Sequence, residues 1–215
     1  MKDPYFQSRY KFDPSREVVW KEIVRYLKPF IKKGSVVVDL GAGYCNFINS
    51  VTAKTKYAVD ISPDFQKFAN HDVKTFVSSV SNLNFLADES VDVAHASNLL
   101  EHFDDHDLVG VISEFGRILK KDGLLILMQP NFRYTYKNYF DDYTHKKIFT
   151  DEGLKNFLVS QDFQVVHRKN KFLPFSVGSL PLPGPAWLAK LLIRGYMVSP
   201  WKPRAGQMLF IAKKK

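Results

Sequence analysis

Cysteine is almost absent, since Cys45 is the only one in a chain of 215 residues. A lone cysteine excludes a disulfide within the chain, so nothing in the composition demands an oxidising compartment. The chain also lacks an apolar run long enough to span a bilayer, and no apolar segment follows a basic stub at its amino terminus. From these absences we expect a cytoplasmic protein.

Acidic residues are fewer than basic ones, with 22 Asp and Glu against 31 Lys and Arg, which gives a formal net charge of +9. A basic excess favours contact with a polyanion or an anionic membrane, and it equally fits a solvated basic surface. The pattern carries no strong nucleic-acid signal. Hydrophobic residues make up 45% of the chain, which is enough for a buried core and argues against disorder.

Short apolar runs alternate with helical patterns along most of the chain. Strands joined by helices run parallel, so the alternation predicts an α/β fold. We expect a doubly wound, Rossmann-like sheet of seven mostly parallel strands with helices on both faces. The strands are expected at residues 36–40, 56–59, 75–77, 91–94, 124–128, 163–166 and 207–212.

The chain is expected to form one domain over residues 1–215. Residues 1–33 predict a helical lead-in that ends or bends at Pro29. Ser62 and Thr150 are expected to cap the helices that follow them. Residues 172–206 differ from the rest, because prolines, aromatics and cations there surround a short apolar helix, and we interpret them as an insertion before the last strand.

The stretch that follows the first expected strand has two glycines but lacks a third. Gly41 and Gly43 suit a tight turn and a close backbone approach, but a dinucleotide fingerprint needs a third glycine where Asn46 stands. Asp39 precedes the glycines, where an acid would oppose a phosphate and attract a cation such as an ammonium group. Asp60 ends the second strand, where an acid can bind ribose hydroxyls or simply lie at the surface. Together the two acids favour S-adenosylmethionine.

The ordered motifs resemble those of the class I S-adenosylmethionine-dependent methyltransferases. They are VVVDLGAGYCNF (36–47), YAVDIS (57–62), SVDVAHASNLLEHF (90–103), LKKDGLLILMQPN (119–131) and HKKIFTDEGLKNFLVSQDF (145–163). By this resemblance Gly41 and Gly43 contact the amino acid portion of the cofactor, and Asp39 binds its methionine end, indirectly or through water. Asp60 holds the ribose and Ile61 flanks the adenine.

Two positions depart from the pattern of these enzymes. Cys45 stands where they often have a third glycine. At the position where they often place an acid on the adenine amino group, this chain has Ser79, followed by Val80. Serine is the weaker partner, so we expect the adenine to rest on packing and backbone contacts.

The proton acceptor is expected in the segment 130–145, which begins where the fifth strand ends. His145 is the predicted base for a hydroxyl acceptor, because the unperturbed pKa of histidine is near neutrality. Asp142 could orient it, and a capping or core histidine is the alternative. The stretch EHFDDHD (101–107) is rich in metal-ligand types, but without a second group of ligands we expect no metal there. We expect instead a helix cap from Asp104, Asp105 or Asp107, with Glu101 and His102 positioned at the cofactor rim.

The acceptor is the least specified part of this hypothesis. The aromatic, basic segment 172–206 suits contact with a membrane surface or a lipid-linked acceptor, and packing over the sheet edge is its alternative. The pattern is also similar to that of bacterial methyltransferases of saccharide biosynthesis, so we expect O-methylation of a saccharide or lipid-linked glycan. The alternatives are another acceptor such as a small molecule or RNA, a basic binding module, and an NAD-dependent oxidoreductase.

Overall fold

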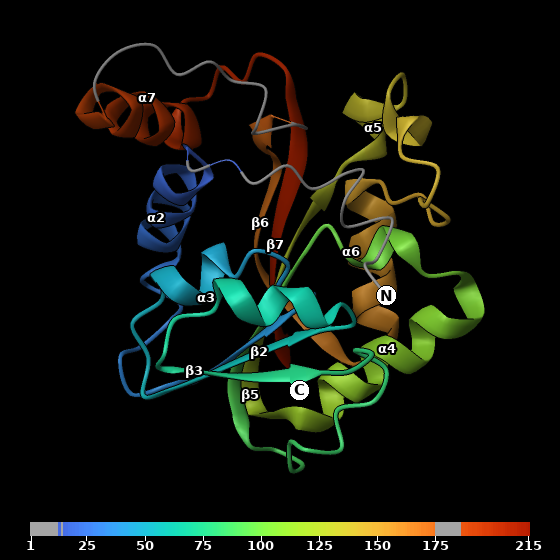
Figure 1. The fold of residues 1–215 in the computed structure, drawn as a ribbon. Helices are drawn as coiled ribbons and strands as arrows, with labels where there is room; N and C mark the ends of the chain where they lie inside the picture. The colour runs from blue at the N-terminus through green and yellow to red at the C-terminus, as the bar shows by residue number, and fades with distance from the viewer. Residues whose placement is uncertain (1–12, 14, 175–185) are drawn as a thin grey trace.

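The computed structural model describes residues 13, 15–174 and 186–215. Across these residues seven strands form one sheet in the order β3-β2-β1-β4-β5-β7-β6, which confirms the predicted fold (Figure 1). All neighbours from β3 to β5 pair in parallel, and β7 runs antiparallel to β5 and β6. The strands are β1 (Val36–Leu40), β2 (Thr55–Asp60), β3 (Val73–Val77), β4 (Val91–Ser97), β5 (Leu119–Pro130), β6 (Phe163–Pro174) and β7 (Ala205–Lys214).

Helices cover both faces of this sheet. Figure 1 shows α4 and α6 on one face and α2, α3 and α7 on the other. On that second face α2 and α7 lie side by side, and Arg194 of α7 pairs with the buried Glu22 of α2. The helices and 3₁₀ turns are α2 (Ser15–Leu27), α3 (Asn46–Ser50), η1 (Pro63–Phe68), η2 (Leu100–His102), α4 (Asp105–Ile118), α5 (Phe132–Thr135), η3 (Tyr139–Asp141), α6 (Asp151–Ser160) and α7 (Ala186–Val198).

The two faces of the sheet bury two separate hydrophobic cores. In β1, Val37 packs with α2 and α3, whereas its neighbour Val38 packs with α4 and α6. In β4, Val93 packs on the same face as Val37, and its neighbour Ala94 packs on the same face as Val38. Successive side chains of a strand point to opposite faces, so a strand covered on both sides must be apolar throughout. This explains the continuous apolar runs of the sequence.

Three of the predicted helix boundaries are confirmed and one is wrong. Thr150 accepts a hydrogen bond from the amide of Gly153, and Asp104 caps α4. Helix α2 ends at Leu27, just before Pro29. Ser62 makes no side-chain cap, and η1 is a 3₁₀ turn. The Ser62 amide donates to Asp60 Oδ1 at 2.9 Å, so Ser62 stands at the cap position of η1 and is tied to the end of β2 through its backbone.

The insertion before the last strand is shorter than expected. Strand β6 extends to Pro174, so residues 172–174 belong to the sheet, and residues 205–206 belong to β7. Helix α7 has 13 residues, so it is longer than the short apolar helix expected in this segment. Residues 175–185 and most of the lead-in before residue 15 lie outside the described residues. Within the described part, no helix has the length and hydropathy needed to cross a bilayer.

The side of β1 on which the chain adds new strands changes between β3 and β4, so the strand order reverses between β1 and β4. From β1 the chain builds β2 and β3 to one side, and then β4 and β5 to the other. Ligands of open α/β sheets bind beyond the carboxyl ends of the strands at such a switch point. Asp39 of β1 and His95 of β4 are paired in register across it.

Candidate functional site

The turn after β1, residues 41–45, is called the cofactor loop below. It requires left-handed backbone at three positions, because Gly41, Gly43 and Cys45 have φ values of 73°, 51° and 56°. Two of its amides, those of Gly41 and Ala42, donate to the carbonyl of Val59 at 2.9 and 3.0 Å. Cys45 therefore takes a conformation that favours glycine, at the position where the resembling enzymes often have one.

The carboxylate of Asp60 is tied to the cofactor loop. Its Oδ2 accepts from the Gly43 amide at 2.9 Å, and its Oδ1 accepts from Ser62. A carboxylate has about four acceptor positions, so these bonds leave capacity for ligand hydroxyls. Asp60 thus holds the loop in shape at the end of β2, a role that the sequence did not reveal.

Asp39 forms a buried pair with a histidine that sequence reasoning missed. His95 Nδ1 donates to Asp39 Oδ1 at 2.8 Å, and both side chains are almost fully buried. The His95 ring stacks on Phe47 with centroids 3.6 Å apart, and Trp20 packs edge-on against it. The signal was a histidine inside the apolar run VDVAHAS, since a buried polar side chain needs a partner. The pair fixes the orientation of the Asp39 carboxylate.

A small pocket joins these groups at the switch point. It brings together Asp39, Gly41 and Gly43 with Ser97 and Asn98 from the end of β4. Helix α2 contributes two further walls that the sequence did not predict, the side chains of Arg16 and Trp20. The remaining lining residues are Ala42, Tyr44, Asn46, Phe47 and His95.

The residues expected around the adenine differ in exposure. Ile61, directly after β2, is 72% exposed, which suits an apolar surface for a planar ring. Ser79 bonds through its hydroxyl to Ser81 at 2.7 Å. The Val80 side chain is buried in the core, so only its backbone can meet a ligand.

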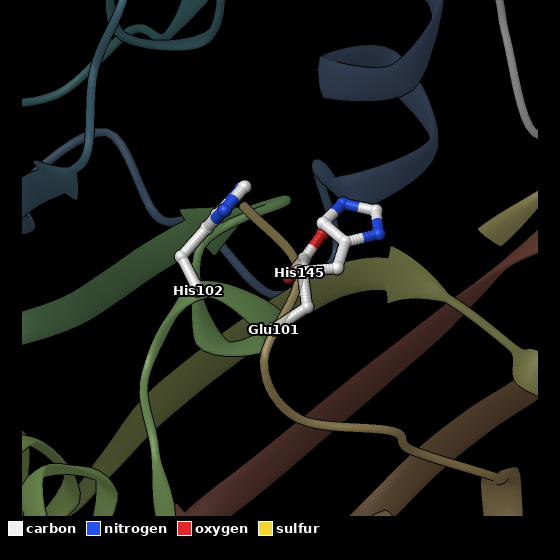
Figure 2. Close-up of side chains that lie close together, drawn as sticks. All are labelled: Glu101, His102 and His145. Carbon is white, nitrogen blue, oxygen red and sulfur yellow. The ribbon is translucent and has the colours of Figure 1, made fainter. Parts of the chain in front are cut away.

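A second group of polar side chains lies beyond the ends of β4 and β5. One ligand atom each from Glu101, His102 and His145 lies within 4.8 Å of the other two. Figure 2 shows Glu101 and His102 on the turn after β4 and His145 on the loop after β5. We call these three residues the Glu-His-His cluster. The sequence argument against a metal relied on the lack of a second group of ligands, and the fold supplies His145 from a distant segment.

Hydrogen bonds determine which ring nitrogen of each histidine carries the proton. His145 Nδ1 donates to the carbonyl of Tyr139 at 2.6 Å. The Thr144 hydroxyl donates to Asp142 Oδ1 at 2.6 Å, so it must accept from His102 Nδ1, which is 3.0 Å away. His145 therefore carries its proton on Nδ1 and its lone pair on Nε2, and His102 is held through Nδ1 by the Thr144 hydroxyl. Asp142, predicted to orient His145, acts through Thr144 on His102 in these contacts.

Burial dominates the electrostatics of this cluster. Glu101 is 1% exposed, and neither of its carboxylate oxygens has a hydrogen-bond partner among the described residues. Burial, with the nearby charge of Asp142, raises the pKa of Glu101 to about 8. Burial and the neighbouring His145 lower the pKa of His102, which favours its neutral form.

Comparisons with known proteins give a consistent class. Residues 38–127 match the family model described as a methyltransferase domain. A crystal structure of an S-adenosylmethionine-dependent methyltransferase from Archaeoglobus fulgidus aligns with a TM-score of 0.71 and 25% identity, over 99% of this chain and 100% of that one. A comparison with curated proteins gives no match.

Two more distant structures share the fold alone. One is a Haloferax volcanii methyltransferase in complex with a methyltransferase activator, at a TM-score of 0.68 and 15% identity over 92% of this chain and 90% of that one. The other is a geranyl diphosphate methyltransferase in complex with S-adenosylmethionine. It aligns with a TM-score of 0.66 and 14% identity, over 96% of this chain and 93% of that one.

The fold and these matches define the class of the protein. The chain has the Rossmann-like class I fold and is an S-adenosylmethionine-dependent methyltransferase, with S-adenosylmethionine as its cofactor. The loop itself requires glycine at position 41, because its φ is 73° and a Cβ there would lie only 3.0 Å from Leu99. An acid at the end of β2 and the exposed Ile61 after it fit a ribose and an adenine. The oxidoreductase alternative is therefore set aside.

Proposed function

We propose that this methyltransferase O-methylates a saccharide or a lipid-linked glycan. The observation that carries this proposal is a group of exposed aromatic side chains on the loop that also bears His145. The side chains of Tyr136, Phe140 and Tyr143 are 58%, 56% and 78% exposed, and Tyr134 is 42% exposed. Aromatic faces of this kind offer flat apolar surfaces to the C–H faces of a sugar ring.

The cofactor would be held by the switch-point residues. Gly41 and Gly43 would let the backbone approach its amino acid portion, and Asp39, fixed by His95, would attract its ammonium group. Asp60 would accept from the ribose hydroxyls, with Ile61 against the adenine. Ser79 and the backbone of Val80 would complete the adenine site. When bound, the cofactor supplies a methyl group on a sulfonium.

His145 is our proposed group for activating the acceptor hydroxyl. Its lone pair is on Nε2, because Nδ1 donates to the carbonyl of Tyr139. Asp142 supports the same region through Thr144 and His102. Direct proton transfer to His145 stays a prediction, and it requires the acceptor within hydrogen-bond reach of Nε2.

We also propose that α7 contacts a membrane surface. Trp187 and Leu191 lie one helical turn apart and are 62% and 53% exposed, and Trp201 beyond the helix is 77% exposed. Exposed apolar side chains with Lys190 on the same helix suit an interfacial helix and a lipid-linked acceptor. A Trp187→Ala, Leu191→Ala double variant should sediment with anionic vesicles at least about tenfold less strongly. Val109→Ala, an exposed apolar change on α4, is the matched control, and equal sedimentation of both variants would remove α7 from the proposal.

The cofactor assignment is tested by calorimetry with S-adenosylhomocysteine. We expect a dissociation constant in the low micromolar range, about 7 to 8 kcal/mol. Mass spectrometry of candidate acceptors, with saccharides, lipid-linked glycans, small molecules and RNA in parallel, then identifies the substrate class. Methylation restricted to RNA or to a small molecule without hydroxyl groups would refute glycan O-methylation.

A further inference from the structure

We propose that Glu101, His102 and His145 bind a divalent transition-metal ion such as Zn²⁺, Mn²⁺ or Co²⁺. Figure 2 shows these three side chains close together, with one ring nitrogen of His145 on the side of His102 and the other facing away. One carboxylate and two neutral imidazoles form a donor set typical of catalytic metal sites that keep open positions. All three side chains of the cluster are of types that bind such ions.

The buried carboxylate is the first observation in favour of a cation. Both oxygens of Glu101 lack hydrogen-bond partners within the described chain, although the side chain is almost fully buried. A buried carboxylate is costly unless it is paired, hydrogen-bonded or bound to a metal. A divalent cation would supply the missing partner for both oxygens at once.

The hydrogen bonds behind the histidines are the second observation. Metal-binding histidines usually donate their other ring N–H to a carbonyl or a carboxylate, which fixes the ring and its tautomer. His145 donates to the Tyr139 carbonyl, and His102 donates to Thr144, which in turn donates to Asp142. Both rings are thus held through Nδ1, the arrangement by which metal-binding histidines are oriented.

The backbone holds the two segments of the cluster together. The amides of Lys146 and Lys147 both donate to the carbonyl of Glu101, at 2.8 and 3.0 Å. The loop that carries His145 is therefore fastened to the turn that carries Glu101 and His102. Ligand atoms within 4.8 Å of one another would close to about 3.4 Å around a common tetrahedral ion at about 2.0–2.2 Å from each.

The metal would add a means of activating the acceptor hydroxyl, and this step rests on the proposed O-methylation. Three protein ligands leave positions for an acceptor hydroxyl, and a bound cation lowers the pKa of an oxygen that it coordinates. The acceptor proton would then leave to solvent, and His145 would activate the acceptor as a metal ligand instead of taking the proton itself. Metal binding as such needs no acceptor, so it can be tested alone.

The test uses the full chain without a polyhistidine tag, stripped with a chelator and dialysed. Equilibrium dialysis against micromolar Zn²⁺, Mn²⁺ or Co²⁺, with metal measured by mass spectrometry, should give one equivalent per chain for at least one of them. Glu101→Gln and His145→Ala should each weaken binding by at least about tenfold. His106→Ala removes an exposed histidine outside the cluster and should leave the affinity unchanged.

A second variant covers the case in which Glu101→Gln does not fold. Thr144→Val keeps the side-chain shape and all three ligands but removes the hydroxyl 3.0 Å from His102 Nδ1 and leaves only the Thr144 carbonyl at 3.4 Å, so it should weaken the metal by about tenfold. No stoichiometric binding of any of the three ions, or wild-type affinity in these variants, would overturn the proposal. Calorimetry with S-adenosylhomocysteine on the same samples separates a failed metal site from a failed cofactor assignment.

Discussion

The cofactor loop and the Glu-His-His cluster lie at the same edge of the sheet, and the chain builds them in opposite ways. The cofactor loop occupies residues 41–45, between one strand and the next helix, and its geometry depends on glycine backbone angles. The cluster joins the turn after β4 to the loop after β5, and its geometry depends on side-chain hydrogen bonds. A local backbone feature can be recognised from a short sequence motif, whereas a cluster that the fold assembles from distant segments cannot.

The two regions also differ in what supports their acids. Asp39 and Asp60 have identified partners in His95 and in the Gly43 and Ser62 amides. Glu101 is buried with no hydrogen-bond partner for its oxygens among the described residues. The acids on the cofactor side are therefore paired within the protein, whereas the buried Glu101 carboxylate calls for a ligand.

The largest expected effect is on the cofactor loop. Gly43→Val should weaken S-adenosylhomocysteine binding by at least about a hundredfold, because a β-branched side chain is strained at φ 51° and projects where the ligand backbone contacts are expected. Gly110→Val on α4, where a Cβ meets nothing within 4 Å, is the matched control. Circular dichroism verifies folding. Normal affinity in a folded Gly43→Val protein would contradict this position for the cofactor.

The next effect concerns turnover. His145→Ala should lower the methylation rate by about a hundredfold, because the acceptor loses the group that activates its hydroxyl. S-adenosylhomocysteine affinity should stay within about twofold, because the cofactor loop is built without this residue. Steady-state rates and calorimetry on the same preparation measure the two. A rate within about threefold of wild type would remove His145 from the mechanism, as would an equal loss in His106→Ala.

A smaller effect is expected at the ribose position. Asp60→Ala should weaken S-adenosylhomocysteine by about 1 to 3 kcal/mol, because ribose hydroxyls lose a charged acceptor and the Gly43 amide loses its partner. Asp64→Ala, an acid paired with Lys67 on the neighbouring η1 turn, should change the affinity little. Calorimetry compares the two. Equal affinities would mean that Asp60 neither binds the ribose nor holds the loop in its binding shape.

Much of the fold followed from local patterns. The apolar runs predicted β1, β4 and β5 because strands buried on both faces must be apolar throughout, and Thr150 and Asp104 were recognisable as caps. Strand ends were less predictable. The strand predicted at 163–166 extends to Pro174 because its pairing with β7 continues, with register shifts, past the polar residues 167–171. Pairing of this kind depends on a partner strand far along the chain.

The site was predictable only where the chemistry is local. Gly41, Gly43 and Asp60 stand in two short motifs, so the sequence named them. His95 and Trp20 were missed because their role depends on a stack that the fold assembles from β4, α3 and α2. For the same reason Glu101 and His145 could not be joined by spacing, since a loop closure sets their distance.

The smallest expected effect tests the strain at Cys45. The backbone of Cys45 is in the left-handed region, and its side chain is fully buried. Cys45→Gly therefore relieves a backbone cost of about 1 kcal/mol. It also loses buried sulfur contacts worth about as much. Its free energy of unfolding should therefore stay within about 1 kcal/mol of wild type. Cys45→Ala keeps the strained Cβ and loses the sulfur, so it should be the less stable variant by about 0.5 to 1 kcal/mol. Denaturant unfolding ranks the two, and an alanine variant more stable than the glycine variant would show that the left-handed angle costs this loop nothing.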